Sequence, residues 1–137
     1  MDLKKVVITA IACIILLILL LNSSILADQA VAWVTKNPKD PEAALVLFRA
    51  GRWCDTMGDN DRAQVIYWQL DEQYPERADL VAPALFYSAD ILANGSNILG
   101  LRKQANPILE IIMNQYSSQQ EWSTKAKKLF DEVNYVR

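Results

Sequence analysis

The chain has 137 residues, a formal net charge of −2 and no histidine. Residues 28–137 carry 12 basic and 15 acidic side chains; this balance excludes nucleic acid as the expected partner, because phosphate binding requires a clustered basic face. The lack of histidine removes the commonest general base and the commonest metal ligand. We therefore expect a protein that is not an enzyme, with no catalytic residues, no cofactor, no metal and no small-molecule substrate.

The N-terminal region is strongly apolar. A short basic lead, Lys4-Lys5, is followed by Val6 to Leu21, a run that only Thr9 interrupts. This run gives about 24 Å of helix, short of the ~30 Å hydrocarbon core of a bilayer. We expect Ile25-Leu26 to extend it enough to span.

These features predict a transmembrane signal-anchor over residues 1–27, in contact with lipid through residues 6–26. The basic lead should stay in the cytoplasm, which places the C-terminal domain in the periplasm as part of a single-pass protein of the bacterial inner membrane. The alternative is a signal peptide that is cleaved after Ala27.

Residues 28–43 are predicted to be a juxtamembrane helix and a proline-rich joint. The helix should run from Asp28 to Lys36 and stop at Asn37-Pro38. Asp40 is expected to cap the next helix, with Pro41 in its first position.

Residues 44–77 place small, aromatic and proline residues at fixed spacings. These residues are Leu47, Ala50-Gly51, Cys54, Gly58-Asp59, Ala63, Tyr67, Leu70 and Pro75. The spacing fits a 34-residue unit, and the segment resembles a tetratricopeptide repeat. It is similar to repeats of bacterial periplasmic assembly proteins that have an N-terminal membrane anchor. The small side chains let two antiparallel helices approach closely, and Cys54 is expected to be buried.

A divergent second repeat is predicted over residues 78–117. Phe86 and Ala89 each follow Phe48 and Gly51 by 38 positions. In the second helix the offset becomes 42, and Ala105, Leu109, Ile112 and Tyr116 echo Ala63, Tyr67, Leu70 and Tyr74. The extra four residues fall in a loop over 94–100, which is either tucked against the domain or presented to a partner.

The last segment, residues 118–137, is predicted to be a capping helix. Ser118 and Glu121 have the spacing of a capping box. One apolar face is formed by Trp122, Ala126, Leu129, Val133 and Val136. The predicted fold is therefore all-α: one transmembrane helix, then a small repeat domain over 44–137 with two helix pairs and a solvating helix.

The resemblance also implies a binding surface, since the first helix of each tetratricopeptide pair lines the concave face. The residues that it places there are Leu45, Phe48, Arg52, Asp55 and Thr56 from repeat one, and Phe86, Asp90 and Ala93 from repeat two. Two phenylalanines flanked by Arg52 and Asp90 would grip an extended peptide or a partner helix. In the alternative interpretation Phe48 and Phe86 are core residues and the two charges form a solvated ion pair.

The functional hypothesis is a membrane-anchored scaffold or accessory subunit that mediates protein–protein interaction in a cell-envelope complex. Its expected partners are other protein subunits of a membrane complex. The alternative is a receptor or assembly factor that binds client peptides transiently.

Overall fold

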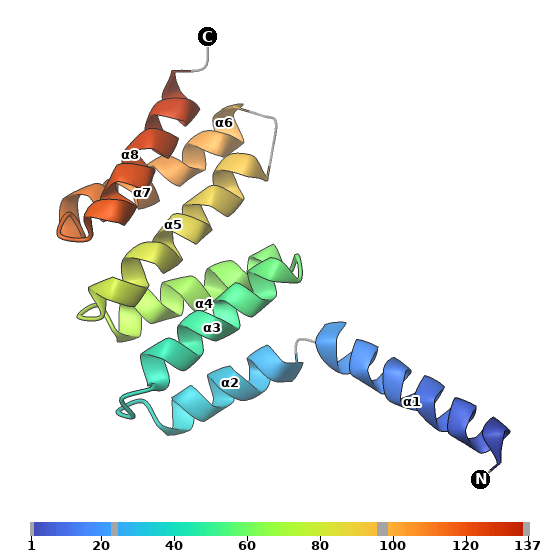
Figure 1. Cartoon of the computed structure of the whole chain (residues 1–137). Helices are drawn as coiled ribbons and strands as arrows, with labels where there is room; N and C mark the ends of the chain where they lie inside the picture. Colours follow the sequence, from blue (N-terminus) through green and yellow to red (C-terminus); the bar gives the residue numbers. More distant parts are fainter. Residues whose placement is uncertain (1, 23–24, 96–98, 136–137) are drawn as a thin grey trace.

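The computed structural model describes residues 2–22, 25–95 and 99–135, and within these ranges the chain forms helices and no strand (Figure 1). The all-helical prediction therefore agrees with the described residues. The elements are α1 (Leu3–Asn22), α2 (Ile25–Lys36), α3 (Ala43–Thr56), α4 (Asn60–Gln73), α5 (Ala78–Asn94), α6 (Leu99–Arg102), the 3-10 turn η1 (Lys103–Ala105), α7 (Asn106–Gln115) and α8 (Gln120–Asn134).

The predicted transmembrane helix is not supported. In the described part of the chain, no helix combines the length and the apolarity that crossing a membrane requires. The predictions of a signal-anchor, a membrane span and a single-pass inner-membrane location with a periplasmic domain are therefore wrong. The expected lipid contact through residues 6–26 assumed such a transmembrane helix.

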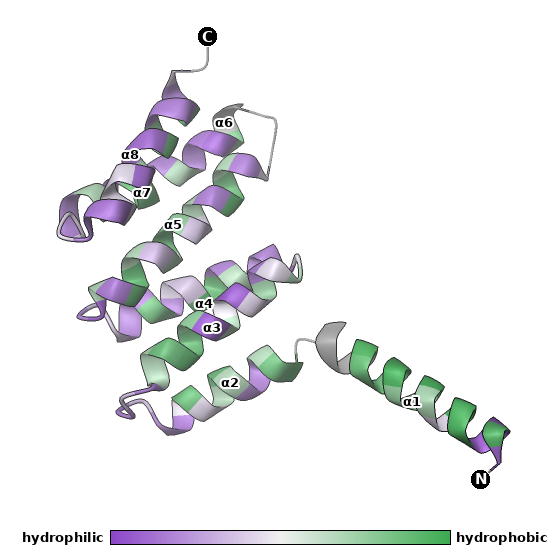
Figure 2. Ribbon diagram, in the orientation of Figure 1, coloured by the Kyte–Doolittle hydropathy of each residue, from purple (hydrophilic) through white to green (hydrophobic). Residues whose placement is uncertain are grey.

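The physical reason lies in where the first helix ends. The prediction needed Ile25-Leu26 to lengthen an apolar run of about 24 Å, but α1 ends at Asn22 and these two residues begin α2. After its first residues, the part of α1 that Figure 2 colours is mostly hydrophobic, whereas hydropathy is mixed along α2 to α8.

Helix α2 packs into the helical body. Its Ala27 and Val34 are 1% and 0% exposed and lie in the same apolar core as residues of α3 and α4. An ion pair between Asp28 and Arg62 also links α2 to the start of α4. The joint that follows α2 caps differently from the prediction: Asp40 Oδ1 accepts the Glu42 N–H at 2.9 Å, and α3 begins only at Ala43.

Helices α3 and α4 form a closely packed pair. Gly51 lies against the ring of the fully buried Tyr67, and a Cβ added to Gly51 would come within 2.5 Å of Tyr67 Cε1. The turn between the helices has Gly58 at a φ of +80°, a left-handed conformation that favours glycine. Asp59 then caps α4, because its carboxylate accepts the Arg62 N–H at 3.3 Å.

The second pair, α5 and α7, is separated by the short helix α6 and the turn η1. Part of the predicted loop over 94–100, residues 96–98, lies outside the described residues. Helix α7 starts with Asn106-Pro107, which places the proline in its first turn. The Asn106 and Asn134 side chains exchange hydrogen bonds of 3.0 and 3.1 Å, which ties α7 to the end of α8.

Two tyrosines occupy equivalent places at the ends of the second helices. Tyr74 ends α4 and donates its hydroxyl to the Pro38 carbonyl at 2.9 Å, while Tyr116 ends α7 and donates to Asp71 Oδ1 at 2.7 Å. Each reaches back to the element before its own pair. The two tyrosines, which are 42 residues apart, therefore make equivalent hydrogen bonds in the two pairs.

Helix α8 packs against α5 and α7, with Ala126, Leu129 and Val133 buried. Its predicted capping box does not form, because the helix begins at Gln120 after Gln119, which makes no side-chain cap. Glu121 instead pairs with Lys125 at 2.7 Å. The packing of α8 on α5 creates the surface described next.

Candidate protein-binding pocket

Aromatic rings from three helices gather where α5 faces α8. Phe86 and Tyr87 of α5 both lie 5.6 Å from Trp122 of α8, measured between ring centroids. Tyr87 also lies 6.2 Å from Tyr67 of α4. These separations are typical of stabilising aromatic pairs, so the rings of Phe86, Tyr87 and Trp122 hold one another in place.

Two cations of the chain cover faces of these rings. The Arg52 guanidinium lies 3.7 Å from the centroid of Tyr87, and Lys125 Nζ lies 4.2 Å from that of Trp122. Both are within the range of an attractive cation–π interaction. The aromatic group is therefore bordered by positive charge from α3 on one side and from α8 on the other.

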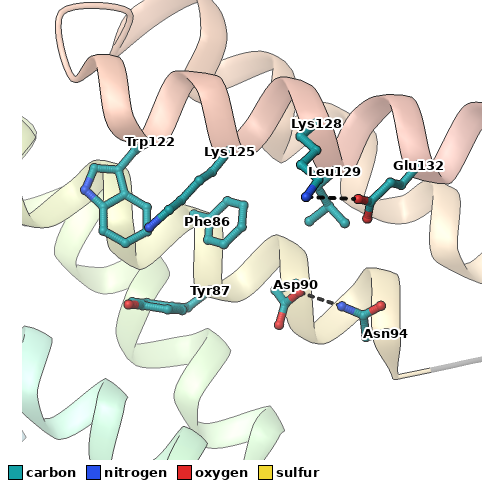
Figure 3. A pocket seen from close by; sticks show the side chains of 9 residues that line it. All are labelled: Phe86, Tyr87, Asp90, Asn94, Trp122, Lys125, Lys128, Leu129 and Glu132. Atoms are coloured by element: carbon teal, nitrogen blue, oxygen red, sulfur yellow. Dashed lines mark hydrogen bonds and ion pairs between the residues drawn. The ribbon is translucent and has the colours of Figure 1, made fainter.

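A pocket of about 310 Å³ opens between α5 and α8 (Figure 3). Its floor includes the buried Leu129, while Phe86, Tyr87 and Trp122 remain partly exposed. The lining residues are Phe86, Tyr87, Asp90 and Asn94 from α5, and Trp122, Lys125, Lys128, Leu129 and Glu132 from α8. The walls are thus apolar rings, and the rim carries charges of both signs.

The charges of α8 are matched along the helix. Lys125 pairs with Glu121 at 2.7 Å, and Lys128 lies 3.9 Å from Glu132. Asp90 of α5 differs, since its recorded side-chain partner is the Asn94 amide, which donates to Asp90 Oδ1 at 2.5 Å. Burial raises the pKa of the Asp90 carboxyl, and the nearby Asp55 and Glu132 raise it further, against the opposing effect of Asn94.

The structure brings only some of the predicted surface residues together. Phe86 and Asp90 line the pocket. The ion pair of Arg52 is with Asp55, at 2.7 Å, and not with Asp90 as the alternative interpretation expected. Tyr67 also donates to Asp55, at 3.3 Å. Arg52 and Asp55 therefore contact the tyrosines of the aromatic group, and neither residue lines the pocket.

The other predicted residues lie apart from the pocket. Leu45 and Phe48 are partly buried against the core, and among the described aromatic pairs none joins Phe48 to Phe86. Ala93 is fully buried, so its side chain has no surface to offer a partner. The exposed Thr56 donates its hydroxyl to the Arg52 carbonyl at 2.8 Å.

The sequence interpretation did not include the half of the pocket that α8 contributes, or Tyr87. The sequence predicts Trp122 only as a member of the apolar face of the last helix. The one sequence feature that could have indicated the contribution of α8 to the pocket is a tryptophan at the start of a helix whose opposite face is polar. Only the packing of α8 on α5 shows that Trp122 meets Phe86 and Tyr87.

The chemistry of this surface suits binding. Over the described residues, histidine, cysteine and carboxylate side chains form no group of three that could hold a metal ion. Cys54 is 2% exposed, and burial raises the pKa of its thiol, which disfavours the reactive thiolate. The pocket instead combines partly exposed rings with two carboxylates, Asp90 and Glu132, and two ammonium groups, Lys125 and Lys128.

Comparisons with protein-family models, with curated proteins and with solved structures find no significant match for this chain.

Proposed function

We propose that the helical body, α2 to α8, is a non-enzymatic interaction module of the tetratricopeptide type that holds a segment of another protein against the α5–α8 pocket. The observation that carries this proposal is the set of partly exposed rings, Phe86, Tyr87 and Trp122, around a pocket of about 310 Å³. The repeat spacing and the equivalent tyrosines Tyr74 and Tyr116 support the family assignment.

The pocket has the properties of an interaction hot spot. Tryptophan, tyrosine and arginine are the residues that contribute most often to such sites, and their energetic effect is largest where a partner excludes water from them. Trp122 and Tyr87 are held by neighbouring rings, so little side-chain freedom is lost when a partner binds. The pocket volume is at the low end for small-molecule sites, which start at about 300 Å³. It suits one or two anchoring side chains of a protein.

Affinity isolation of the full-length protein from its source cells tests this proposal. Trp122→Ala removes a pocket wall, and Trp68→Ala is a matched control, because Trp68 is 39% exposed on α4 and outside the pocket. Both variants should retain the helical circular dichroism of the wild type. We expect Trp122→Ala to lower recovery of the partner at least about tenfold, as loss of a hot-spot tryptophan does.

Two results bear on the proposal in opposite ways. Recovery that falls with Trp122→Ala and persists with Trp68→Ala supports a pocket-dependent module. Equal recovery from both folded variants contradicts it. Native mass spectrometry of the isolated complex then separates a permanent subunit, recovered at fixed stoichiometry, from a receptor or assembly factor with substoichiometric clients.

A further inference from the structure

The charges around the pocket do not balance from within the chain. Lys125 and Lys128 each have an acidic neighbour on α8, and Arg52 has Asp55. In the described ranges, Asp90 is in no ion pair, although its carboxylate lines the pocket beside Phe86. A partly buried carboxylate without a cation is costly, and a cation supplied by a partner relieves that cost.

The chain itself shows how one cation can contact a ring and a carboxylate together. The Arg52 guanidinium lies 3.7 Å from the centroid of Tyr87 while it pairs with Asp55 at 2.7 Å. One guanidinium thus satisfies a ring and a carboxylate at the same time. Phe86 and Asp90 provide the same two groups, a ring and a carboxylate one helical turn apart on α5, and both line the pocket (Figure 3).

We propose that the pocket takes an arginine side chain of the partner protein, with its guanidinium on Asp90 and its aliphatic stem against Phe86 and Trp122. This inference rests on the proposed function and specifies the chemistry that the site recognises. In this proposal Asp90 binds the guanidinium, and the rings of Phe86 and Trp122 pack against the aliphatic part of the arginine.

Arginine fits better than lysine for physical reasons. The guanidinium is planar and weakly hydrated, stacks on rings, and donates two parallel hydrogen bonds to one carboxylate. Lysine is a strongly hydrated point charge and already occupies the Trp122 side through Lys125. A partner lysine would meet this ammonium with no compensating planar contact.

Binding should weaken in acid. The charged and hydrogen-bonding groups near Asp90 are Asp55 of α3, Asn94 of α5, and Glu132 with Lys125 and Lys128 of α8. Because the Asp90 pKa lies above its ordinary value, this carboxyl takes up its proton earlier than an exposed aspartate as the pH falls. The guanidinium then loses its charged acceptor.

The test uses the full-length protein and three synthetic peptides, acetyl-Gly-Phe-Xaa-Gly-amide with arginine, citrulline or lysine at Xaa. Citrulline keeps the planar shape and removes the charge. Binding is followed by the nuclear magnetic resonance shift of the Trp122 indole N–H, assigned with Trp122→Phe. We expect the arginine peptide to bind about tenfold more tightly than the citrulline peptide, as removal of one charge-assisted pair predicts, and severalfold more tightly than the lysine peptide.

Asp90→Asn is the deciding variant, since an asparagine keeps the size of the side chain and an acceptor for Asn94. It should bind the arginine and citrulline peptides equally, whereas Glu110→Gln, an exposed change on α7, should keep the arginine preference. Circular dichroism checks that both variants fold. Equal affinity of the wild type for all three peptides would overturn the arginine assignment.

The two proposals fail in distinguishable ways. If none of the peptides binds but partner recovery still depends on Trp122, the arginine assignment is wrong and the interaction module stands. If the arginine peptide binds with the expected dependence on Asp90, the assignment is supported. Recovery that is indifferent to Trp122 would contradict the proposed function itself.

Discussion

The two helix pairs of the body differ in how deeply they bury their aromatic side chains. In α3–α4, Gly51 lets the Tyr67 ring lie flush against the neighbouring helix, and that ring is fully buried. In α5–α7, the element inserted between the helices changes the spacing, and α5 directs Phe86 and Tyr87 toward α8, where they remain partly exposed. One pair uses its aromatic residue for stability, and the other leaves its aromatic residues available for binding.

This difference indicates where change should be tolerated. A buried ring in a closed seam has no room to adjust, because protein interiors are packed at crystal-like density. Rings at the edge of a pocket lose fewer contacts when they are removed. Mutations in the first pair should therefore affect folding, and mutations at the α5–α8 face should affect recognition.

The largest expected effect is from Tyr67→Ala. Loss of a fully buried ring costs about 3–5 kcal/mol of unfolding free energy, and Tyr67 is 0% exposed. Tyr87→Ala is the matched change in the second pair and should cost markedly less, because Tyr87 is partly exposed. Urea unfolding of both variants measures the difference. Equal losses would contradict the division between a closed seam and an open face.

Gly51→Ala should destabilise the first pair by about 1–3 kcal/mol through overpacking. The added methyl would lie 2.5 Å from Tyr67 Cε1 and 3.3 Å from Ile66 Cγ2. In a Tyr67→Leu background the ring is gone, so the same change should cost little, and a double-mutant cycle in urea reports the coupling. An additive cycle would show that Gly51 does not admit the ring.

Alkaline pH should weaken the fold through Tyr67 and Tyr116. Burial raises the pKa of both phenols above the ordinary value of about 10, and the hydrogen bond to Asp71 raises that of Tyr116 further. A raised folded-state pKa stabilises the fold fully below pH ~10, and the contribution is lost as the pH rises. Tyr67→Phe/Tyr116→Phe should therefore lose less stability than the wild type between pH 8 and pH 11. An identical loss, measured by urea midpoints, would refute this assignment.

The smallest effect is expected at Ser88. Its hydroxyl is fully buried on α5 and makes no recorded hydrogen bond. A buried hydroxyl without a partner costs free energy, so Ser88→Ala should leave stability unchanged or raise it by up to ~1 kcal/mol. Ser123→Ala, at a partly exposed site on α8, is the control. A clear destabilisation by Ser88→Ala would mean that the hydroxyl has a partner.

The sequence predicted those parts of the fold that depend on local spacing. The close approach of the two helices around Gly51 and Tyr67 and the burial of Cys54 follow from residues within one repeat unit. The transmembrane prediction failed because apolar composition does not show where a helix ends, and Ile25-Leu26 joined α2.

The pocket could be predicted only in part, because its two walls come from segments more than 25 residues apart. The 38-residue offset between the repeats predicts Phe86 and Asp90 as surface residues. The register paired Phe86 with Phe48 of the preceding repeat, but the packing brings it to Trp122 of the following helix instead. An inserted element between α5 and α7 shifts such contacts in a way that residue spacing does not reveal.

Site-specific photocrosslinking in the source cells tests whether the α5–α8 face binds a partner protein. A photoreactive phenylalanine analogue at position 128, on the pocket rim of α8, is compared with the same analogue at position 65, which is 63% exposed on α4 and outside the pocket. We expect a crosslink to one partner protein from position 128, reduced by Asp90→Asn, and none to that partner from position 65. Crosslinking to the partner from position 65 but not from position 128 would contradict the assignment of binding to the α5–α8 face.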